Sequence, residues 1–181
     1  MTISASRKVT INRAPVLTLW AAVVAERMGF DREEALTMGK AVAGMNAYAK
    51  GVRIGIYQPA PASVREQRKV LREGEQLHVD LLNRAVPVTR TSEGLRALAK
   101  EKPVNPASVE KYLASKFGPS LEAVRAAMTG LAASLPPHGL AQQAFRLYED
   151  FRPAIPAGER GWGAAGVLDL DVIEALARKG Q

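Results

Sequence analysis

The chain of 181 residues contains no cysteine and only two histidines, His78 and His138. The absence of cysteine excludes disulfides, cysteine-ligated zinc, iron–sulfur clusters and thiol nucleophiles. No pair of histidines stands at the helical spacing that metal ligands need. We therefore expect no metal, no cofactor and no catalytic residue, and a reducing cytoplasm fits this inventory.

Long apolar runs are also lacking. The first residues, MTISASRKVTINR, contain no apolar stretch of the kind found in a secretory signal. The longest apolar run, residues 14–25, has about a dozen residues, whereas a membrane-spanning helix needs roughly 20. The sequence thus predicts a soluble, cytoplasmic protein in which this run forms a buried helix.

Positive charge is unevenly distributed. Residues 1–102 carry 17 Lys and Arg against 10 Asp and Glu, while residues 103–181 carry 8 of each, so the first part holds the whole net charge of +7. Such asymmetry indicates an anionic partner for the first part. The alternative is a surface charge that only keeps the protein soluble.

Two helices joined by a tight corner are predicted near the start, after a polar arm with a short extended piece at KVTIN. Helix 15–28 ends at Gly29, which enters a left-handed conformation at little cost. Asp31 then caps a second helix, with Glu34 completing a capping box. We expect this second helix to end at Gly51.

The first of these helices is apolar nearly all round, which predicts a central position. The second carries small residues at four-residue spacing, which favours the close approach of another element. These residues are Ala35, Gly39, Ala43 and Ala47. Glycine within a helix is costly, so Gly39 and Gly44 are expected to have packing reasons.

The remainder of the first part mixes strands and helices. We predict a strand at 51–57, a helix at 63–74, a hairpin centred on Asn83-Arg84 and a short helix at 92–100. Pro87 cannot donate a hydrogen bond, which predicts an edge position for its strand.

The second part is predicted to be helical. The motif EKPVNP (101–106) is the best candidate for a boundary, because its two prolines and Asn105 interrupt the helical pattern. Four helices follow, with expected caps or stops at Asn105, Pro106, Gly118, Ser120, Pro153 and either Asp169 or Asp171; a loop rich in Gly and Pro precedes the last helix.

These patterns predict a mainly α (α+β) protein. A helical hairpin with a small antiparallel sheet and a basic helix occupies residues 10–100, and a helical domain occupies residues 103–181. The two parts can also pack as one unit.

Residues 21–40 resemble the helix-turn-helix unit of bacterial regulators. Ala25 and Gly29 match its small residue and its turn glycine, and apolar residues match its buried positions. The resemblance implies that the second helix enters the major groove of DNA, with Arg32, Thr37 and Lys40 nearest the bases. Against this, the acidic first turn would face phosphates. A plain helical hairpin needs the same geometry.

Two further resemblances are local. Met28-Gly29-Phe30 followed by Ala35-Leu36 resembles the loop of ubiquitin-associated three-helix domains, whose third helix has no counterpart here. The segments KYLASKFG, AFRLYEDFRP and GWGAAGVLDLD resemble bacterial proteins of unknown function, which implies no activity.

Four cations share one face of the predicted helix 63–74: Arg65, Arg68, Lys69 and Arg72. No acid interrupts this stripe, so it is the better candidate for phosphate contacts. Arg84 is expected at the tip of the following hairpin, and the combination resembles a winged helix-turn-helix. The alternative is a solvated outer face with Val64 and Leu71 directed inward.

The motif GERGWGAAG spells the glycine pattern of dinucleotide-binding folds, but no strand precedes it and no βαβ pattern surrounds it. We therefore reject nucleotide binding. Trp162 in this loop is either a partner contact or a side chain that covers the last helix.

Our hypothesis is a non-enzymatic nucleic-acid-binding protein, of which a regulator is one form, whose neutral second part serves oligomerisation or partner binding. A protein–protein interaction or structural module with no nucleic acid is the main alternative. An enzyme with a pocket between the two parts is a third.

Overall fold

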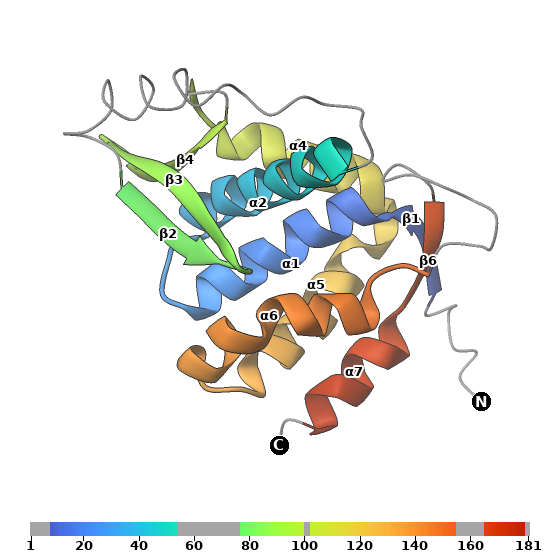
Figure 1. Cartoon of the computed structure of the whole chain (residues 1–181). Coiled ribbons are helices and arrows are strands. Elements are labelled where there is room, and N and C mark those ends of the chain that lie inside the picture. Colours follow the sequence, from blue (N-terminus) through green and yellow to red (C-terminus); the bar gives the residue numbers. More distant parts are fainter. Residues whose placement is uncertain (1–7, 54–76, 100–101, 155–164, 180–181) are drawn as a thin grey trace.

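The computed structural model describes residues 8–53, 77–99, 102–154 and 165–179 (Figure 1). Within these ranges the chain forms six α-helices, a two-stranded sheet and a four-stranded sheet. Their order is β1 (Lys8–Asn12), α1 (Arg13–Arg27), α2 (Arg32–Arg53), β2 (Leu77–Leu81), β3 (Arg84–Thr91), β4 (Gly94–Ala99), β5 (Lys102–Pro103), α4 (Pro106–Phe117), the 3₁₀ turn η1 (Gly118–Ser120), α5 (Leu121–Ala133), α6 (Pro137–Phe151), β6 (Ala165–Asp169) and α7 (Leu170–Lys179).

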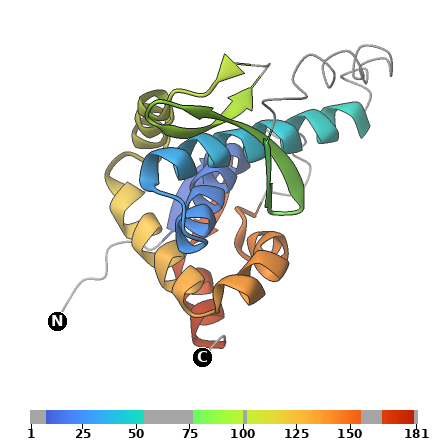
Figure 2. The same ribbon diagram turned by 90° about the vertical axis from the view of Figure 1, so that its left-hand side faces the viewer.

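Helix α1 is the centre of the molecule, as its apolar sequence predicts. Every residue from Pro15 to Ala25 is buried. Helix α2 lies along one side of α1, and α5 and α6 lie along another (Figures 1 and 2). The Trp20 indole N–H of α1 donates to the Ala144 carbonyl oxygen of α6 at 2.9 Å. The predicted first and second parts of the chain therefore share α1 as a packing surface.

The corner between α1 and α2 has the predicted local structure. Gly29 adopts a φ of +113°, and the Phe30 N–H donates to the Ala25 carbonyl at 3.1 Å. The Asp31 carboxylate accepts from the Glu34 N–H at 2.8 Å, while the Glu34 carboxylate accepts from the Asp31 N–H at 3.1 Å. This reciprocal pair confirms the capping box.

The end of α2 differs from the prediction. The helix continues through Gly51 to Arg53, so Gly51 does not stop it and residues 51–53 are not a strand. The penalty for one glycine in a helix is small, and the other residues of this long helix outweigh it. The remainder of the expected strand, up to residue 57, lies outside the described residues.

Gly39 brings α2 unusually close to α1. A Cβ built on Gly39 would overlap the Thr18 carbonyl oxygen and lie 3.0 Å from the Ala22 nitrogen. This contact confirms the packing role predicted for Gly39. Among the described residues outside its own stretch of α2, nothing lies within 4 Å of a Cβ built on Gly44, so the same prediction is wrong there.

We predict that Gly39→Ala lowers the free energy of unfolding by about 1–3 kcal/mol, because the helices must separate to admit the methyl group. Gly44→Ala is the matched control and should raise stability by up to about 1 kcal/mol through helix propensity. Urea unfolding followed by circular dichroism measures both. Equal effects of the two substitutions would contradict the close-packing account.

The hairpin β2–β3 is present, but its turn residues are Leu82 and Asn83, with φ of 47° and 63°. The turn thus lies one residue earlier than expected. Strand β3 pairs with β2 on one side and β4 on the other, so Pro87 is not on an edge strand. Pairing with β4 begins at Val88, beyond Pro87, so the missing N–H removes no bond from that ladder.

The prediction of a helix at 92–100 is wrong, because residues 94–99 form strand β4. Thr91 pairs with Gly94 around a two-residue turn, and Gly94 has a φ of +119°. Leucine and alanine favour helix locally. The pairing with β3 and the bonds from α2 described below outweigh that preference.

The second part follows the predicted helices closely. The Asn105 side chain accepts from the Ala107 N–H at 2.9 Å at the start of α4. The Asp169 carboxylate accepts from the Asp171 N–H at 2.9 Å at the start of α7. Ser120, in contrast, makes no side-chain capping bond, because it belongs to a 3₁₀ turn that leads directly into α5.

A second, two-stranded sheet joins the ends of the chain. The predicted extended piece KVTIN forms β1, which pairs antiparallel with β6 from Lys8↔Asp169 to Asn12↔Ala165. Strand β6 is not predicted from the sequence, because its first two residues, 165 and 166, fall in the loop expected before the last helix. The mixed, predominantly helical α+β class is confirmed, whereas the placement of all strands in the first part is wrong. No helix among the described residues is long and apolar enough to cross a membrane.

Candidate functional site

The first turn of α2 lies along strand β4 and binds its backbone. The Leu95 N–H donates to Glu34 Oε2 at 2.8 Å, and the Ala97 N–H donates to Thr37 Oγ1 at 3.0 Å. The Val104 N–H, from the residue after β5, donates to the Ala97 carbonyl at 2.8 Å. Side chains of a helix thus supply acceptors that a neighbouring strand would otherwise supply.

Arg96 projects from β4 into a cluster of acceptors. Its side chain is only 5% exposed, and its guanidinium contacts the carboxylates of Glu33 at 2.9 Å and Glu93 at 3.6 Å. It also donates to the Leu95 carbonyl at 2.8 Å. A buried guanidinium needs such partners, since removing it from water uncompensated is costly. Glu33 and Glu93 are themselves 62% and 80% exposed, so they keep contact with solvent.

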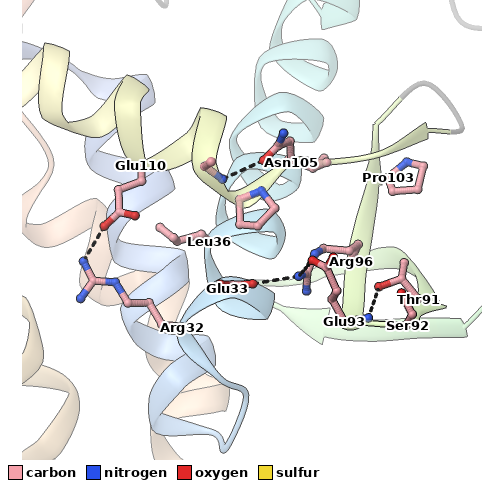
Figure 3. A pocket seen from close by; sticks show the side chains of 13 residues that line it. Arg32, Glu33, Leu36, Thr91, Ser92, Glu93, Arg96, Pro103, Asn105 and Glu110 are labelled. Atoms are coloured by element: carbon pink, nitrogen blue, oxygen red, sulfur yellow. Dashed lines mark hydrogen bonds and ion pairs between the residues drawn. The ribbon is translucent and has the colours of Figure 1, made fainter.

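An open cleft of about 680 Å³ lies beside Arg96, between the start of α2, the β3–β4 turn and the start of α4 (Figure 3). Arg32 and Glu110 form an ion pair of 3.0 Å across one side of it. Leu36, Pro103, Val104 and Pro106 provide apolar walls. The cleft therefore combines paired charges with a small apolar surface.

The side chains that line this cleft are better suited to binding a polar group than to catalysing a reaction on it. Its ionised groups are Arg32, Arg96, Glu33, Glu93 and Glu110, and the two guanidiniums are paired with the three carboxylates. No histidine lines it. No group of three potential metal ligands occurs among the described residues. We assign no catalytic residue to it.

The predicted base-reading residues of α2 are engaged within the fold. Thr37 is fully buried, and its hydroxyl donates to the Glu34 carbonyl at 2.8 Å while accepting from Ala97. Its predicted contact with bases is wrong for this structure, because β4 covers it. Arg32 pairs with Glu110, and Lys40 lies 4.5 Å from the centre of the Tyr112 ring, a cation–π contact with α4.

In the first half of α2, only Arg32, Glu33 and Lys40 are exposed. All residues from Ala35 to Gly39 are buried, because α1, β4 and α4 pack around them. A recognition helix must expose one side to the groove. The buried turn from Ala35 to Gly39 therefore offers no side chain to a groove.

Other predicted residues lie elsewhere. The Arg84 Nε donates to Asn46 Oδ1 at 3.0 Å, near the last turns of α2. Arg65, Arg68, Lys69 and Arg72 fall within residues 54–76, and Trp162 within residues 155–164, both outside the described residues.

Sequence reasoning missed Arg96, because its segment was predicted as a helix. The surplus of acids in the first turn of α2 was the available signal, because β4 (GLRALA) shows no alternation. The acids in the first turn of α2 do more than cap this helix, since Glu33 pairs with Arg96 and Glu34 accepts from the Leu95 N–H.

Comparison of the chain with models of protein families, with curated proteins and with solved structures finds no match. The function must therefore be inferred from the residues and their arrangement.

We predict that Glu34→Ala lowers the free energy of unfolding by about 1–3 kcal/mol, because it removes the acceptor for both Asp31 and Leu95. Glu122→Ala is the control, since Glu122 is also an exposed acid in the first turn of a helix, α5. It should cost less than about 0.5 kcal/mol. Urea unfolding that gives equal losses for both variants would count against a special role of Glu34.

Thr37→Val should also destabilise the protein by about 1–3 kcal/mol, because the buried Ala97 N–H loses its acceptor. Thr18→Val is matched in burial, but the Thr18 hydroxyl only donates back to Ala14 within α1. That substitution should change stability by about 0.5 kcal/mol or less. Thermal unfolding of the two variants in parallel tests the difference, and a harmless Thr37→Val would refute the bond to β4.

Proposed function

We propose that this protein is a non-enzymatic nucleic-acid-binding protein that holds the phosphate backbone through basic residues of its first part. The observation that carries the proposal is the concentration of the whole net charge of +7 in residues 1–102. Phosphate contacts by Lys and Arg supply most of the affinity of such proteins and require no base reading.

The distribution of charge along α2 indicates where contact would occur. Its first turn is acidic, with Glu33 and Glu34, and would repel phosphates. Its opposite end carries Lys50 and Arg53 in the sequence, and Arg84 lies beside Asn46 toward that end. The chain then enters residues 54–76, which contain the basic stripe predicted at 63–74.

Arg65, Arg68, Lys69 and Arg72 are the proposed main phosphate contacts, and Arg84 is a further one. Arg32 and Lys40 take a lesser part, because they pack against α4. The cleft beside Arg96 has no part in this proposal, since its guanidiniums are already paired with carboxylates.

The rival proposal is an interaction module without nucleic acid, which predicts a large apolar patch and a stable oligomer. The described residues expose three large hydrophobic side chains, Leu77, Val167 and Val172, from three different elements. This is ordinary for a protein surface and gives the rival little support. Oligomerisation through the neutral second part remains compatible with nucleic-acid binding.

We expect the protein to bind a short DNA or RNA duplex at low salt, measured by fluorescence anisotropy. Replacing Arg65, Arg68, Lys69 and Arg72 by Gln should reduce the slope of log affinity against log salt by about 0.9 for each lost contact with DNA. The control replaces Lys111, Lys116, Arg146 and Lys179, four exposed cations of the neutral part, and should leave the slope nearly unchanged.

Lack of binding by the unmodified protein at low salt would refute the proposal. Equal losses in the test and control variants would show that net charge alone is responsible. A stable oligomer by light scattering, without duplex affinity, would favour the interaction module.

A further inference from the structure

The cleft beside Arg96 exposes its acids and buries one of its two cations. The Arg96 side chain is 5% exposed, whereas the side chains of Glu33 and Glu93 that contact it are 62% and 80% exposed. The guanidinium of Arg96 is thus withdrawn from solvent, while both of its carboxylates remain open to it.

The second ion pair of the cleft leaves both partners accessible. Glu110 and Arg32 are joined at 3.0 Å, and their side chains are 54% and 52% exposed. The charges that a ligand would meet are therefore three carboxylates against one guanidinium, a net charge of −2. A cleft lined with charge of one sign concentrates ligands of the opposite sign, so this cleft favours cations.

The carboxylates of the cleft are held in place by guanidiniums of the protein itself. Glu33 Oε2 accepts from Arg96 at 2.9 Å, and Glu110 Oε1 accepts from Arg32 at 3.0 Å. Each bond engages one oxygen, whereas a carboxylate has two oxygens and about four acceptor positions. These carboxylates therefore have the capacity to accept from a further donor, and their positions are already fixed, which lowers the cost of ordering them on binding.

The walls of the cleft suit an aliphatic chain. Figure 3 shows Leu36 between Glu110 and Glu33. Three more apolar side chains line the cleft: Pro103, Val104 and Pro106. Lysine and arginine lay their methylene groups along such surfaces and keep the charged head among polar groups. The volume of about 680 Å³ also lies within the range of about 300–1,000 Å³ that is typical of small-molecule sites.

We propose that this cleft binds an organic cation, a guanidinium or primary ammonium group on an aliphatic chain, as in arginine or lysine. The carboxylates of Glu93 and Glu110 receive the charged head, and the apolar walls contact the chain. A guanidinium is the favoured head, because Glu33 and Glu110 already accept from this group within the fold. The site is separate from residues 63–74 and independent of nucleic-acid binding.

An anion is the competing occupant, because α2 and α4 both begin at the cleft and the start of a helix attracts negative charge. The protein already supplies that charge at α2, through Glu33 and Glu34 in its first turn. At α4 the Asn105 side chain accepts from the Ala107 N–H. The exposed carboxylates therefore decide the sign of the ligand.

Isothermal titration at low ionic strength tests the site with blocked amino acids that differ in one side-chain group. The probes are the N-acetyl amides of L-arginine, L-lysine, L-citrulline and L-glutamate. We expect saturable binding of the arginine and lysine probes and none of citrulline, its uncharged counterpart, or of glutamate. Free L-arginine is titrated in parallel. Tighter binding of the free form identifies a small molecule as the ligand, and tighter binding of the blocked form identifies a peptide side chain.

Glu93→Gln and Glu110→Gln should each weaken binding of the arginine probe by about three- to tenfold, because each removes one exposed carboxylate from the cleft. Glu122→Gln removes an exposed acid from the first turn of α5, outside the cleft, and should leave binding unchanged. The Tm of all three variants should stay within about 2 °C of the unmodified protein, since the substituted side chains are exposed.

Equal binding of the citrulline and arginine probes would overturn the proposal, because the apolar walls alone would then hold the ligand. Binding of the glutamate probe would overturn it in favour of an anion at the starts of the helices. Absence of binding by either cationic probe, or equal losses in Glu122→Gln and the two cleft variants, would also overturn it. None of these results bears on duplex binding by residues 63–74.

Discussion

The Glu34 carboxylate joins the helical hairpin to the sheet. One of its oxygens accepts from the Asp31 N–H at the start of α2, and the other accepts from the Leu95 N–H in β4. Thr37, one turn later, repeats the contact with Ala97. Together these bonds set the position of β4 against α2, and hence the position of Arg96 between Glu33 and Glu93. The cleft in Figure 3 exists because these elements are held in that order.

The same bonds engage residues that a helix-turn-helix unit would present to DNA, because Thr37 is fully buried against β4. The local pattern of the corner at Gly29 suits a helix-turn-helix unit, since the turn glycine and the buried positions are correct. Any tightly packed helical hairpin needs those residues, however, and the polar residues of the following turns also hold the fold together. Glu34 and Thr37 bind β4, and Arg32 pairs with Glu110 of α4.

The two arginine environments of this protein differ in their counter-charges. Arg96 is almost fully buried and is balanced by carboxylates, which makes it a structural cation. Arg13, at the start of α1, instead donates to the Pro153 carbonyl oxygen at 3.0 Å. The first arrangement balances a buried cation with carboxylates, whereas in the second a neutral carbonyl accepts the bond.

The sequence by itself determined the features that depend on neighbouring residues. The apolar α1, the turn at Gly29, the box of Asp31 and Glu34, and the cap at Asn105 all follow from contacts within a few positions, where side-chain chemistry and backbone geometry suffice. The tertiary structure alone decided that residues 94–99 form a strand, that β1 pairs with β6, and that Arg13 donates to the Pro153 carbonyl. Those outcomes depend on residues as many as 140 positions apart. Local preference there is weak, and pairing and burial between distant segments outweigh it.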